Sequence, residues 1–199
     1  MIGGFNLKQL LNAKKMIVIL ITLVLLISII TWVYPYSSLS VYKNYSYNKG
    51  LVLVNGKTHE EIVQKFKRRL EFDLEEKEQN RTVSYTQNIL PLFEQDWYIK
   101  EDAVTIKKQD LETMLMHVKN TRSTLLSLLQ HEEYTSEQKM YLEQLINGFL
   151  GIEEYIGYMQ HEPFLSRGDI RRSLGNLRDS QGLLFSIFTT FYDLALRNV

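Results

Sequence analysis

The stretch MIVILITLVLLISIITWVY, residues 16–34, decides how this chain is organised. It contains 19 residues and no charge. A helix of this length rises about 28 Å, which is close to the hydrocarbon thickness of a bilayer. The stretch Leu183–Leu196 is the next candidate, but it has only 14 residues and includes Asp193. We therefore predict a membrane protein with one transmembrane helix, residues 16–34.

The charges around this helix predict its orientation. Three basic residues and no acidic residue precede it, and short flanking segments rich in Lys and Arg stay in the cytoplasm. We predict a short cytoplasmic tail, residues 1–15, a single-pass signal-anchor in the cell membrane, and an extracytoplasmic remainder. Lysines and aromatic rings suit the headgroup levels at the two ends of the span. The expected membrane-interface anchors are Lys14, Lys15, Trp32, Tyr34 and Tyr36.

A cleaved secretory signal is the alternative interpretation of this segment. Ser38-Leu39-Ser40 has the small-x-small pattern of a cleavage site. The apolar run is longer than a usual signal core, and no Ala precedes the cut, so the uncleaved anchor is favoured. Whether the chain is cut near Ser40 stays open at this point.

Composition limits the partners and the chemistry. The chain has no Cys, which excludes disulfides, thiolate metal sites and cysteine acylation. All 23 acidic residues but only 20 of the 23 basic residues follow residue 35, so no positive excess attracts nucleic acid. The outer part has about 160 residues, enough for one domain with a proper core.

The outer part divides into a stalk and a helical domain. Residues 35–57 are rich in Tyr and Ser, and we interpret them as a stalk that holds the domain clear of the membrane. Leu51–Val54 followed by Asn55-Gly56 is also compatible with a short strand and a turn. Residues 58–199 form the predicted helical bundle.

Apolar residues three and four apart predict the helices of this domain. A capping box of Thr58 and Glu61 opens the first, at about 59–79, and similar boxes at Thr135 and Ser166 open two others. Short connections favour antiparallel neighbours packed along a coiled-coil-like seam. The predicted fold is all-α, an antiparallel bundle of one shorter helix and three long ones, at about 107–131, 136–161 and 167–197.

The segment 80–106 has no clear period. Pro91 is expected to break any helix there, and the large aromatic residues either plug the bundle or form an exposed contact surface. The last helix also carries apolar residues outside its seam. We name as the candidate interaction surface Phe93, Trp97, Tyr98, Leu183, Phe185 and Ile187.

Glycines and arginines in the last two helices each have two interpretations. Gly148, Gly151 and Gly157, with Gly168, Gly175 and Gly182, allow either close packing of a neighbouring helix or a groove for a partner. The arginines at positions 167, 171, 172 and 178 form either a solvated face or a site for an anionic wall polymer or lipid headgroup.

The sequence contains no catalytic or cofactor motif. The four His, at positions 59, 117, 131 and 161, form neither HExxH nor Glu-x-x-His, and no phosphate-binding loop or GxSxG occurs. We therefore expect a protein that is not an enzyme and binds no metal or cofactor.

The expected function is that of an interaction or scaffold module in the bacterial cell envelope. The bundle would bind another envelope or membrane protein, or a second copy of itself. The alternative is a sensor-like bundle that holds a small molecule between its last two helices. With one span and a short tail, we expect no inward signalling by the chain alone.

Overall fold

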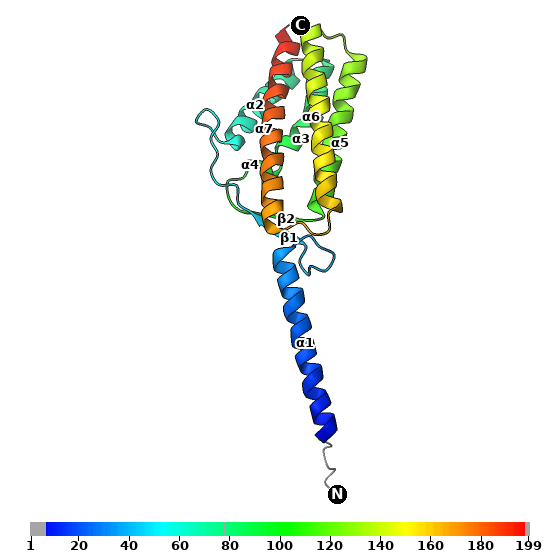
Figure 1. Cartoon of the computed structure of the whole chain (residues 1–199). Helices are drawn as coiled ribbons and strands as arrows, with labels where there is room; N and C mark the ends of the chain where they lie inside the picture. The colour runs from blue at the N-terminus through cyan, green and yellow to red at the C-terminus, as the bar shows by residue number, and fades with distance from the viewer. Residues whose placement is uncertain (1–6, 78, 198–199) are drawn as a thin grey trace.

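A computed structural model describes residues 7–77 and 79–197. Figure 1 shows one long helix, α1 (Leu7–Val33), projecting from a group of packed helices. The prediction of a mostly helical chain with one apolar N-terminal helix is confirmed. Ala13–Val33, 21 residues, is long and apolar enough to cross a membrane, and none of it is buried. The predicted tail begins outside the described residues, and its part from Leu7 onward is already helical.

Three long helices form the regular part of the domain: α5 (Asp110–His131), α6 (Ser136–His161) and α7 (Arg167–Arg197). Helix α6 packs against both α5 and α7, and successive helices alternate in direction in Figure 1. Helices α6 and α7 begin and end where the sequence predicts. Helix α5 starts three residues later than predicted, because residues up to Lys107 belong to a strand.

The segment 59–99 forms three helices. Helix α2 (His59–Glu76) opens on the predicted capping box of Thr58 and Glu61. Helix α3 (Arg81–Phe93) and the short α4 (Asp96–Ile99) correct the prediction that Pro91 breaks any helix here. Pro91 lies in the last turn of α3, where its missing N–H interrupts little of the helix. The Asn80 side chain caps the helix by accepting a hydrogen bond from the Val83 N–H at 3.2 Å.

Two short strands correct the all-α prediction at one end of the bundle. β1 (Asn44–Tyr47) and β2 (Val104–Lys107) pair antiparallel, with Asn44 opposite Lys107. The proposed strand at Leu51–Val54 does not form; Val54 makes only one isolated bridge, to Lys57, around a tight turn. A strand needs a partner for its backbone groups, and only the earlier segment reaches one.

Residues 36–47 of the predicted stalk, 35–57, are therefore part of the folded domain and do not form a spacer. Tyr36, Tyr45 and Tyr47 are buried in the same core as the helices. The Tyr36 hydroxyl donates a hydrogen bond to the Ile106 carbonyl at 3.1 Å. The chain thus enters the domain core within a few residues of the end of α1.

A cluster of aromatic rings joins the short helices to the long ones. The Phe93 ring of α3 lies 6.3 Å from that of Phe149, 4.8 Å from Phe185 and 5.9 Å from Phe188, between ring centroids. Buried polar contacts reinforce the junction: the Gln181 amide donates to the Leu92 carbonyl at 2.7 Å. This packing fixes α2 and α3 against α7, and so positions the surface described next.

Candidate functional site

Four of the six predicted interaction residues are not on the surface. Phe93, Trp97, Tyr98 and Phe185 are buried, so this part of the prediction is wrong for the described structure. Large aromatic rings contribute most to stability when they leave water, and here they plug the space between α3, α4 and α7. Leu183 is 63% exposed and Ile187 is half-buried, so these two remain available on α7.

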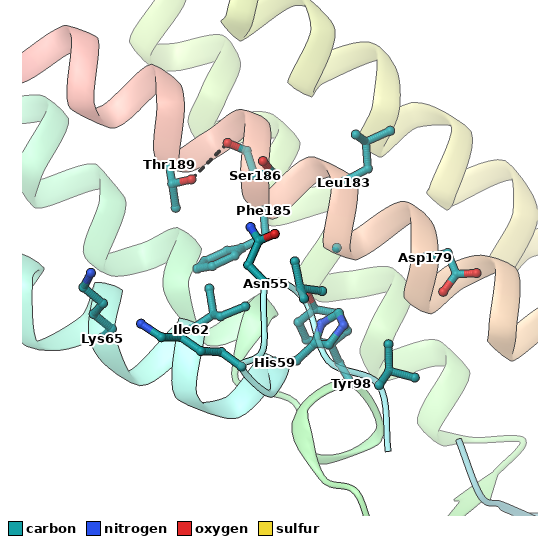
Figure 2. Close-up of a pocket in the computed structure, with 14 residues that line it drawn as sticks. Asn55, His59, Ile62, Lys65, Tyr98, Asp179, Leu183, Phe185, Ser186 and Thr189 are labelled. Atoms are coloured by element: carbon teal, nitrogen blue, oxygen red, sulfur yellow. Dashed lines mark hydrogen bonds between the residues drawn. The ribbon is translucent and has the colours of Figure 1, made fainter. Parts of the chain in front are cut away.

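A groove of about 600 Å³ lies beside Leu183 (Figure 2). One wall is the loop 52–57 with the start of α2, which contributes His59 and Ile62. The other wall is α7, which contributes Leu183, Ser186 and Thr189. Phe185, whose ring Figure 2 shows between α2 and α7, and Tyr98 also line the groove, and both are buried. The groove is therefore mostly apolar and is open to solvent on one side.

The loop that forms the wall is itself exposed and apolar. Leu51 and Leu53 are both more than half exposed. Left-handed backbone at Gly50, Asn55 and Gly56 turns the loop back on itself beside the groove, a conformation that Gly and Asn adopt readily. Val52 and Val54 of this loop line the groove together with Leu183 of α7. From the sequence, Leu51–Val54 was only a candidate for a short strand.

A glycine allows the two walls to approach. A Cβ added to Gly182 would lie 3.3 Å from Cε1 of His59 and 3.6 Å from the Tyr98 hydroxyl. At Gly148 an added Cβ would lie within 2.3 Å of the Leu184 side chain, so that glycine accommodates α6–α7 packing. Gly151, Gly157 and Gly175 have no such neighbour. Close packing therefore explains two of the six glycines, and only Gly182 borders the groove.

Two basic residues, Lys49 and Arg178, lie close to His59 in the wall of the groove. The Lys49 ammonium donates to the Tyr98 carbonyl at 2.6 Å, and burial together with the nearby Arg178 lowers the pKa of Lys49 to about 8. Burial, Lys49 and Arg178 also lower the pKa of His59. The His59 ring meets the Tyr98 ring edge to face at 4.9 Å. His59 is therefore a neutral wall residue at neutral pH.

The groove has the chemistry of a binding surface. Within the described part of the chain, no three His, Asp or Glu side chains group as metal ligands would. The groove itself brings His59 and Asp179 together with hydroxyls and apolar groups. Lys57 and Lys65 line its solvent side. Such an arrangement can accept an apolar group flanked by negative charge.

The predicted membrane-interface anchors have different environments. Lys14 and Lys15 are exposed on α1, and Trp32 is exposed near the C-terminal end of this helix. The Tyr34 ring packs edge to face on Phe164 at 5.8 Å. Tyr36 is the exception. The chain turns into the bundle after Pro35, so the Tyr36 ring is fully buried in the domain core.

The four arginines at the start of α7 do not form one solvated face. Arg172 pairs with Asp169, and Arg178 pairs with Asp179. Arg167 instead lies over two aromatic rings, those of Trp32 at 4.5 Å and Tyr45 at 5.2 Å. It therefore belongs to the junction between α1 and the domain.

Comparison with known proteins gives no relative for this chain. No protein-family model matches it, and no curated protein or solved structure matches it.

Proposed function

We propose that this protein is a membrane-anchored docking module of the cell envelope. Helix α1 spans the cell membrane with its N-terminus in the cytoplasm, and the antiparallel bundle outside binds another membrane or envelope protein. The observation that supports this best is the apolar groove, whose lining includes the exposed side chains of Val54 and Leu183.

The membrane assignment is supported by the exposure of α1. A core helix of a soluble protein with this composition would be covered by other elements, whereas α1 projects alone. Its exposed apolar side chains need a hydrocarbon environment. The lysines near its start and the absence of acidic residues there support the proposed orientation.

The groove is proposed to bind an apolar segment of the partner. Contiguous exposed apolar residues around a concave surface are typical of interaction sites. Phe185 and Tyr98 line the groove and are already desolvated, as at the centre of many interfaces. Lys57 and Lys65 at the edge favour acidic residues flanking the inserted segment.

Site-specific photocrosslinking in native membranes tests this proposal. A photoreactive residue replaces Leu183 at the groove or Leu150 on α6, which is also exposed but lies outside the groove lining. We expect one dominant adduct from position 183 and none from position 150. The captured protein, once purified, should bind the full-length wild-type chain, and Leu183→Asp should weaken binding about tenfold or more, since buried apolar anchors dominate interfaces.

Two results would reject this docking site. One is the same set of adducts from both positions. The other is unchanged affinity in the Leu183→Asp variant, provided that its circular dichroism and thermal unfolding match those of the wild type. Self-adducts from position 183 would identify a second copy of the chain as the partner.

A small-molecule ligand is the second candidate function. The groove volume of about 600 Å³ lies within the usual range of ligand pockets. The site would lie between α2 and α7, not between α6 and α7 as the sequence suggested, because Leu184 fills the space at Gly148. A ligand that raises the unfolding temperature of the wild type but not of a Gly182→Leu variant would support this candidate.

A further inference from the structure

The loop after α1 folds back toward the membrane end of the molecule. The Val41 N–H donates a hydrogen bond to the Thr31 hydroxyl at 3.3 Å. Thr31 lies in the last turn of α1, which ends at Val33. The loop therefore reaches back to a level inside the apolar span. Three apolar side chains of this loop are each at least 58% exposed: Leu39, Val41 and Tyr42.

A crevice of about 480 Å³ separates this loop from α1. Ile27, Ser28, Thr31 and Trp32 of α1 line one side, and the loop residues Val41 and Tyr42 line the other. Ile27 lies one helical turn and more below the outer end of α1. The crevice thus extends from the level of the acyl chains to the end of the span.

Arg167 lines the same crevice. Its guanidinium lies over the Trp32 and Tyr45 rings, which fix its position. Among the described residues it makes no ion pair, unlike Arg172 and Arg178 on the same helix. The nearest acidic residue in sequence, Asp169, is held by Ser166 and Arg172. Arg167 is therefore a fixed positive charge without a protein counter-ion.

We propose that this crevice binds one anionic phospholipid, with its phosphate on Arg167 and an acyl chain along Ile27 and Val41. A guanidinium matches the planar pair of phosphate oxygens, and the hydroxyl of Tyr42 and the amide of Asn44 can donate to the remaining headgroup oxygens. Basic pockets beside transmembrane helices are suited to lipid headgroups. The inference rests on the proposed membrane span.

Such a lipid would lie between α1 and the helical domain. It would fill the space between α1 and the loop and would satisfy the charge of Arg167. The domain would then rest on the bilayer surface with Leu39 and Phe164, both exposed, in the headgroup layer. The height of the docking groove above the membrane would be fixed.

Native mass spectrometry of the full-length protein tests this inference. The protein is purified in detergent with added phosphatidylglycerol or phosphatidylcholine, and bound lipid is counted on each variant. We expect one retained phosphatidylglycerol on the wild type. Arg167→Gln should bind it about 10- to 100-fold more weakly, as expected for loss of a charge-assisted contact. Arg172→Gln is the matched control and should bind like the wild type.

The other outcomes separate a failed lipid site from a failed membrane span. Equal phosphatidylglycerol retention by Arg167→Gln and wild type would overturn the site, and so would displacement of the lipid by inorganic phosphate, which would indicate a simple anion site. Extraction of the wild type from membranes by alkaline carbonate would instead refute the span itself. Loss of lipid in Arg167→Gln, with the variant still resistant to extraction, would support the inference.

Discussion

Two regions of this protein are built in different ways. Helices α5–α7 are long and regular, and each is specified by its own repeat of apolar residues. Residues 34–107 form short helices, two strands and loops, which are held by contacts with residues far along the chain, such as Tyr36 with Ile106 and Gln181 with Leu92. Both proposed surfaces, the groove and the crevice, lie where this irregular region meets α7 or α1.

The two regions therefore have different roles in the molecule. The long helices provide a rigid frame, whereas the irregular region supplies the loops that face partners. Loops on rigid scaffolds are common positions for function. The junction between the two regions should therefore dominate stability, and changes at exposed loop positions should leave stability nearly unchanged.

Phe93→Ala should have the largest effect. Phe93 is fully buried at the junction and contacts three other rings, so the variant leaves a cavity. We expect a loss of about 3 to 5 kcal/mol in the free energy of unfolding. Phe72→Ala, on an exposed position of α2, should change it by less than about 0.5 kcal/mol. Thermal unfolding of the full-length protein in micelles measures both, and equal effects would show that the junction is not part of the core.

A pair of glycines in α6 tests the frame itself. Gly148→Ala places a methyl group against Leu184, and we expect it to destabilise by about 1 to 3 kcal/mol through overpacking. Gly151→Ala has open space and should stabilise by up to about 1 kcal/mol, because Ala favours a helix. The two variants should therefore shift the unfolding temperature in opposite directions. Shifts of the same sign would contradict the observed α6–α7 contact.

Tyr36→Phe tests the connection between α1 and the sheet. The variant keeps the ring but removes the hydroxyl that donates to the Ile106 carbonyl. We expect a loss of about 1 kcal/mol, typical of one buried hydrogen bond. Tyr42→Phe, at an exposed tyrosine six residues on, should have no measurable effect on unfolding. An unchanged Tyr36→Phe protein would indicate that residues 34–47 behave as the spacer predicted from sequence.

The smallest effect concerns pH. The folded state lowers the pKa of His59 through burial and through Lys49 and Arg178, with Asp179 opposing. Below the ordinary histidine pKa of 6.5 the unfolded chain binds the proton first, so the protein should lose stability as pH falls from there toward the lowered value. His59→Gln should lose less over that window. Identical slopes for wild type and variant between pH 7.5 and 5 would exclude this contribution.

The sequence predicts the long helices and the start of α2 well, but it predicts the strands, α3 and α4 poorly, for a physical reason. The ends of α6 and α7 follow from local signals: the caps at Thr135 and Ser166, and repeats of three and four. By contrast, β1 exists because β2 lies beside it, and no local pattern contains that information. Residues 80–93 do contain a local pattern that indicates a helix: Asn80 is a suitable cap, and buried positions recur three and four apart. Pro91 argued against a helix in this segment.

The candidate site was predicted only in part. Leu183 is predicted from the sequence because it lies outside the seam of α7, and its side chain is exposed in the structure. Sequence alone does not distinguish an aromatic plug from an aromatic patch, so the predicted surface includes Phe93, Trp97, Tyr98 and Phe185, which are buried in the structure. The sequence does not separate residues 52–57 from the rest of the predicted stalk, 35–57, because their position in the groove wall depends on where α2 and α7 meet them.

Hydrogen exchange along the full-length protein in lipid nanodiscs tests the central claim most directly. Residues 36–47 contribute Tyr36, Tyr45 and Tyr47 to the domain core and so connect the domain to α1. We predict that amides of β1 are protected nearly as well as those of α6, since both belong to one cooperative unit. Exchange of residues 36–47 at the rate of an unstructured peptide, with α6 still protected, would contradict it.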